Sequence, residues 1–188
     1  MKTTILGVMV LVSAAAQAPT LSPSQMPSAA VDVTNAEVRH ILAAAPPDAV
    51  MDQQIRVVDI GKYNVAVGVL HRSAKAKQTS IEHAQVTEVY HIIDGAGTLV
   101  TGGTITKPTA SPADGATVKI LVGPSTTGAG IRGGRSRRVG PGDVIVVPPG
   151  VAHWFSAMES DMNYLVVRVD ADHVLPAGYV NPALPRER

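Results

Sequence analysis

Residues 80–95 read SIEHAQVTEVYHIIDG and bring two histidines and two glutamates into one short stretch. Such side chains either bind a metal ion or lie on the wet face of an ordinary strand. Strand alternation places Glu88 and Tyr90 on one face and His91 on the opposite, exterior face. His83 precedes Glu88 by five positions, so the two share a face only if the chain turns between them. We therefore predict that His83 ends one strand, that Glu88 begins its antiparallel neighbour, and that the four residues between them form the turn.

A second stretch, GPGDVIVVPPGVAHWF at residues 140–155, places another histidine beside a strand. Val144 to Val147 form the strand pattern, a Pro-Pro-Gly turn follows, and His153 then begins the next strand. Together the two stretches resemble the two motifs of the cupin superfamily, G-x5-H-x-H-x3–4-E-x6-G and G-x5-P-x-G-x2-H-x3-N. The matching positions are His83, Glu88 and Gly95 for the back half of the first motif, and Gly142, Pro148, Gly150 and His153 for the second.

This resemblance implies an all-β fold, the antiparallel double-stranded β-helix or jelly-roll barrel, with a metal ion inside it. Carried over position by position, the ligands of one divalent metal ion are His83, Glu88 and His153. Two imidazoles and one carboxylate suit Fe, Mn or a related ion such as Ni or Zn, and they leave coordination positions open. The superfamily includes dioxygenases, isomerases, lyases and non-catalytic binders, so the resemblance does not select a reaction.

The sequence departs from the cupin motifs at two positions. Ile81 stands where the first motif has its first histidine, and Ala157 stands where the second motif has asparagine. The missing histidine either opens a further metal position for substrate or oxygen, or lowers the metal affinity until the site is empty. Gln85 and His71 are alternative fourth ligands. A barrel without metal, in which the imidazoles and the carboxylate form only polar pairs, is also left open.

Two aromatic residues share the strand parity of the expected ligands. Tyr90 has the parity of Glu88, and Phe155 has the parity of His153. Both are expected to line the cavity or to pack in the core. Tyr90 is the candidate for a general acid or base.

Four arginines precede the second motif in the stretch IRGGRSRRVG: Arg132, Arg135, Arg137 and Arg138. Such a cluster either binds a carboxylate or phosphate through forked hydrogen bonds or forms a solvated loop.

The remaining chain has the pattern of a barrel. Short strand candidates recur between turn residues, and two β-rich runs meet in a hairpin near Gly61. Many short strands with one early helix favour a sandwich or closed barrel. We expect this barrel over residues 48–172, with a long Gly/Thr/Pro-rich insertion at 102–141 that holds one strand, at 117–122, and a C-terminal tail at 173–188.

Composition narrows the class of protein. The 188 residues suffice for one domain with a sizeable core. The formal charge of +1 gives no indication of nucleic acid as a partner. The absence of cysteine excludes a disulfide framework and cysteine-ligated zinc.

The N-terminal segment has the layout of a secretory signal peptide. Residues 1–16 combine a basic start, a short apolar run and small residues before a cleavage point at Gln17. The apolar run is too short for a stable membrane span. Residues 17–33 are a Pro/Ser/Ala-rich flexible lead-in. One short helix is expected within residues 34–47, where a capping-box spacing begins the segment.

These features predict an exported, periplasmic or secreted bacterial protein. We expect a metal-dependent enzyme of dioxygenase, isomerase or lyase type that acts on a small molecule. For the oligomeric state, a homodimer is left open. The alternative is a non-catalytic binder of a small, sugar-like ligand with a degenerate or empty metal site.

Overall fold

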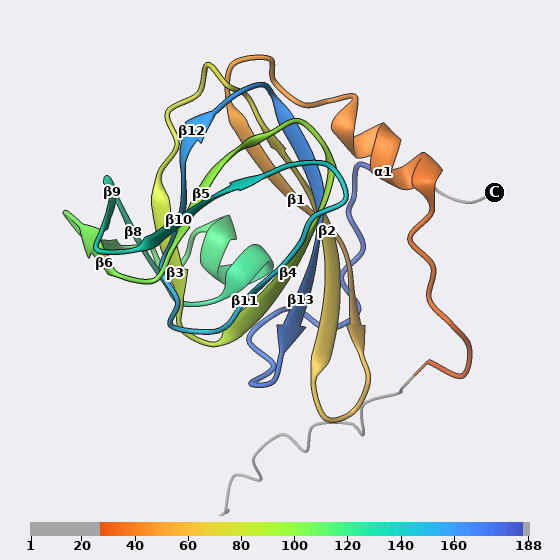
Figure 1. Ribbon diagram of the computed structural model, residues 1–188. Coiled ribbons are helices and arrows are strands. Elements are labelled where there is room, and N and C mark those ends of the chain that lie inside the picture. Colours follow the sequence, from red (N-terminus) through yellow and green to blue (C-terminus); the bar gives the residue numbers. More distant parts are fainter. Residues whose placement is uncertain (1–26, 186–188) are drawn as a thin grey trace, which may run out of the picture.

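The computed structural model describes residues 27–185, and most of their strands form two antiparallel sheets that face each other (Figure 1). The elements in chain order are α1 (Asn35–Leu42), β1 (Val50–Asp59), β2 (Asn64–Arg72), β3 (Ser80–His83), β4 (Val86–Asp94), β5 (Gly97–Thr101), β6 (Thr104–Thr106), β7 (Thr109–Ala110), the π-helix η1 (Thr117–Val122), β8 (Ser125–Gly128), β9 (Gly130–Arg132), β10 (Arg135–Val139), β11 (Val144–Val147), β12 (His153–Met158) and β13 (Met162–Asp170). The predicted signal peptide lies outside the described residues.

The larger strands make up a jelly-roll sandwich. One sheet has the order β1-β2-β13-β4-β11, and the other has the order β10-β5-β12-β3-β8-β7. A small third sheet pairs β6 with β9. This confirms the predicted all-β cupin-like fold with a short N-terminal helix. Within residues 27–185, none of the helices has the length and apolar character needed to cross a membrane.

The interior between the sheets follows from strand alternation. Along β13, residues of one parity are buried, from Met162 and Tyr164 to Arg168 and Asp170. The same alternation on β4 buries Glu88 and its same-face neighbours. The interior therefore contains an apolar half and, further along the same strands, a half with buried charges.

Two predictions about connections were wrong. Residues 117–122 form the π-helix η1 instead of a strand. The hydrophobic periodicity of so short an apolar run does not distinguish a helix from a strand. Residues 102–141 hold the strands β6 to β10 in place of one strand. In Figure 1 the helical segment lies between the two sheets, and its residue Val122 is buried.

The predicted pairing of the strands that carry His83 and Glu88 was also wrong. The turn between β3 and β4 is only two residues long, and β3 belongs to one sheet while β4 belongs to the other. The chain therefore passes from one sheet to the other at Ala84, which is exposed, and Gln85. The two side chains face each other across the sandwich, and not along a hairpin.

Helix α1 lies outside the five-stranded sheet (Figure 1) and packs Val38 and Ile41 against Ile55 and Val69. Its first turn has the predicted capping box. The backbone N–H of Glu37 donates to the Thr34 hydroxyl at 3.2 Å, and the backbone N–H of Thr34 donates to the Glu37 carboxylate at 2.7 Å.

We expect Thr34→Ala to lower the free energy of unfolding by about 1 kcal/mol, since a capping hydroxyl is lost. Thr34→Ser keeps the hydroxyl and is expected to behave like the wild type. Urea unfolding of the three proteins checks this, and equal midpoints for all three would contradict it.

Candidate metal centre

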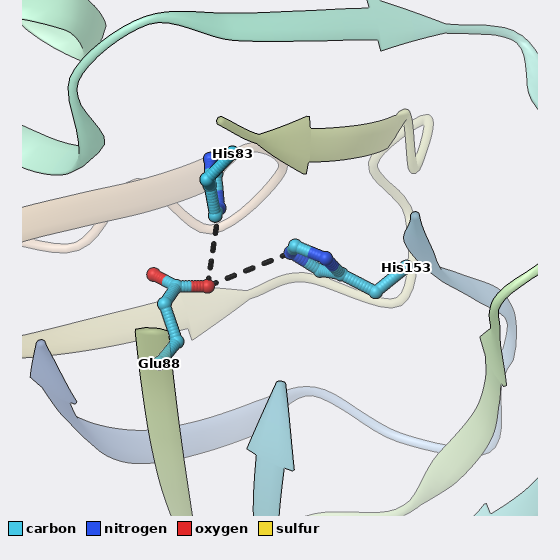
Figure 2. Close-up of side chains that lie close together, drawn as sticks. All are labelled: His83, Glu88 and His153. Carbon is cyan, nitrogen blue, oxygen red and sulfur yellow. Dashed lines mark hydrogen bonds and ion pairs between the residues drawn. The ribbon is translucent and has the colours of Figure 1, made fainter. Parts of the chain in front are cut away.

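Three side chains from three strands meet inside the sandwich (Figure 2). His83 comes from the end of β3, Glu88 from β4 and His153 from the start of β12. The Nε2 atoms of His83 and His153 lie 3.2 Å and 3.5 Å from Oε2 of Glu88. One ligand atom from each residue lies within 4.8 Å of the others, and all three side chains are buried. The predicted convergence is therefore present.

Hydrogen bonds on the far side of each ring decide which nitrogen faces the centre. Nδ1 of His153 lies 3.0 Å from the carbonyl oxygen of Val151, which only accepts, so Nδ1 carries the proton. Nδ1 of His83 lies 3.0 Å from the Ser125 hydroxyl. That hydroxyl donates to the carbonyl oxygen of Gly123 at 2.9 Å, so it accepts from His83. In the neutral rings, both Nε2 atoms therefore direct a lone pair toward Glu88.

This arrangement fits a divalent metal ion. Burial, opposed by the charge of Glu88, lowers the pKa of His153 to about 4, so this ring is neutral near pH 7. Two lone pairs and a carboxylate oxygen directed at one region repel each other unless a cation or a proton lies between them. An Nδ1–H held by a carbonyl or hydroxyl oxygen is also the usual way in which proteins orient a metal-binding imidazole.

The second oxygen of Glu88 is held by a buried arginine that we did not predict. Nε of Arg168 donates to Oε1 of Glu88 at 2.9 Å. The guanidinium also donates to Gln54 and to Asp52, each at 2.6 Å. Arg168 is fully buried. A charged residue at an inward position of the alternating strand MNYLVVRVD was the signal that could have identified it.

These contacts set the ionisation of Glu88 and Tyr90. Burial raises the pKa of the Glu88 carboxyl, but the nearby His83, in its protonated form, and Arg168 outweigh burial and bring it well below its ordinary value. The Tyr90 hydroxyl donates to Oε2 of Glu88 at 2.5 Å. Burial and the charge of Glu88 raise the pKa of Tyr90 well above its ordinary value. Tyr90 therefore keeps its proton at neutral pH and is suited to donate a hydrogen bond, not to act as a base.

A cavity of about 210 Å³ adjoins the three side chains. Its wall includes all three, together with Tyr90 and residues from both sheets. Ile81 lines it as well, as its two-residue offset from His83 predicts. The π-helix η1 contributes Thr117, Leu121 and Val122 to the wall. The cavity thus has the ligand group on one side and a helical segment from the long insertion on another.

The other candidate ligands lie elsewhere. The Gln85 amide donates to the Asp172 carboxylate at 3.0 Å, and His71 lies 2.9 Å from the Asn163 side-chain oxygen. Neither residue lines the cavity beside His83, Glu88 and His153. His91 is exposed, as predicted. Phe155 is buried in the apolar core and is absent from the cavity wall.

The arginine cluster lies on the surface, and its four members are exposed. Arg138 forms two hydrogen bonds with Glu159, each at 2.8 Å. Arg137 lies 3.9 Å from the Asp143 carboxylate. None of the four arginines lines the cavity. This favours a solvated surface loop over an anion-binding cluster.

Comparison with known proteins gives one family and several solved structures. The family model described as Cupin matches residues 82–188. No curated protein matches the sequence. Similar solved structures include the EutQ protein of Clostridium difficile, with 16% identity, a TM-score of 0.38, and coverage of 65% of this chain and 64% of that one.

Two further solved structures are similar. DMSP lyase DddQ from Ruegeria pomeroyi DSS-3 has 16% identity and a TM-score of 0.43, over 73% of this chain and 54% of that one. KdgF from a Halomonas species has 13% identity and a TM-score of 0.39, over 64% of this chain and 78% of that one. The chain therefore spans less than two thirds of the length of EutQ and DddQ.

Proposed function

Because the chain belongs to the cupin family, we propose that it is an exported protein that binds one divalent metal ion through His83, Glu88 and His153 and acts on a small molecule. The observation that carries this proposal is the pair of imidazole Nε2 atoms directed at one buried carboxylate oxygen beside a cavity. Reaction types available to such a site include dioxygenase, isomerase and lyase chemistry.

The residues of the chain would divide the work as follows. A bound divalent ion supplies Lewis-acid or oxygen-activating chemistry. Arg168 holds one oxygen of Glu88, so that the other oxygen stays directed at the two imidazoles. Tyr90 donates a hydrogen bond to the same oxygen and keeps it in place at the cavity wall. Ile81 presents an apolar surface there and leaves one side of the group without a protein ligand.

Metal content tests this proposal directly. Protein purified without chelator is expected to contain about one Fe, Mn, Ni or Zn ion per chain by elemental analysis. After chelator treatment, it is expected to take up one equivalent of Mn(II) or Fe(II) at micromolar concentration. Protein that takes up none of these ions would contradict the proposal.

A second candidate function is non-catalytic binding of a small ligand. One observation favours it: hydrogen bonds from Tyr90, His83 and Arg168 already satisfy the Glu88 carboxylate when His83 is protonated. Such a site is stable without a metal. This is what a degenerate site, with Ile81 in place of the histidine of the motif, requires.

The substitution Ile81→His separates the two candidates. If the metal site works with three ligands, Ile81→His is expected to raise metal affinity by about 10-fold or more, a gain of at least about 1.4 kcal/mol, and to lower any activity by filling an open position. If the site is vestigial, the wild type binds no metal and only the variant does. Metal titration of both proteins distinguishes these results.

Export is proposed from the signal-peptide pattern of residues 1–16, with a periplasmic or secreted location. We expect the mature protein to begin at Gln17. N-terminal sequencing of protein recovered from the periplasm or medium checks this, and a retained Met1 would refute it.

A further inference from the structure

Two buried arginines lie close to the candidate metal centre, and they differ in their partners. Arg168 is paired with the carboxylates of Asp52 and Glu88. Arg72, at the end of β2, is 9% exposed and lines the cavity. Among residues 27–185, no carboxylate forms an ion pair with Arg72. Arg168 therefore has two carboxylate partners, whereas Arg72 has no ion-pair partner among the described residues.

The guanidinium of Arg72 is held in place by neutral groups. Nε donates to the Tyr164 hydroxyl at 2.8 Å, and Nη1 donates to the side-chain oxygen of Gln78 at 3.0 Å. The Gln78 amide nitrogen donates to two backbone carbonyl oxygens, each at 3.0 Å, which fixes its oxygen toward Arg72. The guanidinium carbon lies 4.9 Å from the centre of the Phe155 ring. Within the described chain, these contacts leave Nη2 without a hydrogen bond.

A buried charge without an opposite partner is costly to keep in a protein. The cost is offset when a ligand supplies the anion. Nη2 can donate charge-assisted hydrogen bonds, and a carboxylate is the acceptor that suits a guanidinium best. We propose that Arg72 binds the carboxylate of the molecule on which this site acts, and that this molecule is a small carboxylic acid.

The charges around the cavity support the same ligand. Asp52 and Glu88 contribute two negative charges, and Arg168 and Arg72 contribute two positive charges, which sum to zero. A divalent ion leaves an excess of two positive charges, which an anionic ligand reduces. This part of the inference rests on the proposed metal-binding function, whereas the missing partner of Arg72 does not.

The cavity limits the size of the acid. Its volume of about 210 Å³ is below the roughly 300–1,000 Å³ of sites for drug-sized ligands. Arg72 and the group around Glu88 line the same cavity. A short acid can therefore place its carboxylate on Arg72 while its neighbouring atoms lie toward the metal ligands.

This inference is tested by calorimetric titration with glycolate, lactate and malonate. The affinity for each acid is compared with the affinity for its neutral amide. The titrations use metal-free and Mn(II)-loaded wild-type protein, Arg72→Gln, Arg72→Lys and the control Arg132→Gln. Wild type and control are expected to bind at least one acid about 10-fold or more tightly than its amide. Arg72→Gln is expected to lose this preference, and Arg72→Lys, which keeps the charge but not the planar guanidinium, to retain part of it.

Three results would overturn the inference: equal binding of each acid and its amide by the wild type, no binding of any acid up to about 10 mM, or an unchanged preference in Arg72→Gln. If the wild type takes up no Mn(II) but its metal-free form still prefers the acid, the metal proposal fails and the carboxylate site stands. Arg72→Gln is expected to take up Mn(II) at least as tightly as the wild type, since a positive charge is removed from the cavity wall, and this separates loss of the anion site from loss of the metal site.

Discussion

His153→Ala is expected to lower the affinity for Mn(II) or Fe(II) by more than about 100-fold, with the protein still folded. The substitution removes one of three proposed ligands, and loss of a mere hydrogen-bond partner of a ligand already costs about 10–100-fold. The imidazole is buried at the start of β12, where its Nε2 lies 3.5 Å from Glu88. The effect is measured by titrating the metal ion into chelator-treated protein and monitoring binding by calorimetry or by quenching of the protein fluorescence.

His91→Ala is the matched control for this experiment. His91 belongs to the same strand as Glu88, but its side chain lies on the exposed face. Its replacement is expected to leave metal affinity unchanged. Equal metal affinity for wild type and His153→Ala would exclude His153 as a ligand, while a loss in both variants would point to binding at surface histidines.

Arg168→Met is expected to lower the free energy of unfolding by about 3–5 kcal/mol, the range for breaking a buried ion pair from one side. The methionine keeps most of the volume but leaves Glu88 without its Oε1 donor and Asp52 without its Oδ2 donor. Oδ1 of Asp52 already has no hydrogen bond among the described residues. Both buried carboxylates would then lose their ion pair with Arg168. Urea unfolding followed by circular dichroism measures the loss.

Arg138→Met provides the contrast. Arg138 forms a bidentate salt bridge with Glu159 on the surface. Water and salt weaken the attraction there, so the free energy of unfolding is expected to change little. Adding Glu88→Gln to Arg168→Met should recover part of the lost stability, because one of the two unmatched charges is removed. Equal stability of wild type and Arg168→Met would contradict a structural role for the buried pair.

The local motifs were enough to predict which residues form the candidate site. The turn before Glu88 and the Pro-Pro-Gly turn before His153 are short, so the spacing along the chain restricts where each side chain can lie. The alternation of β4 likewise separated Tyr90 inside from His91 outside. Each of these predictions depends on a few consecutive residues and on the two-residue period of a strand.

Other features of the site depend on pairings between distant segments. Glu88 and Arg168 are direct cross-strand neighbours of β4 and β13, which lie 80 positions apart in the chain. A shift of this register by one residue would turn Arg168 out of the interior. No local pattern contains that register, since it is set by the packing of the whole sheet.

By itself, the sequence determined the cupin-like strand pattern, the inward parity of the candidate ligands and the apolar residue at position 81. Only the tertiary structure decided that β3 and β4 lie in opposite sheets, that residues 117–122 form a helix at the cavity, and that Arg168 is matched while Arg72 is not. The physical reason is that strand alternation assigns each side chain to a face of the sheet. The residues that this side chain contacts depend on the pairing of distant strands and on the burial of charge.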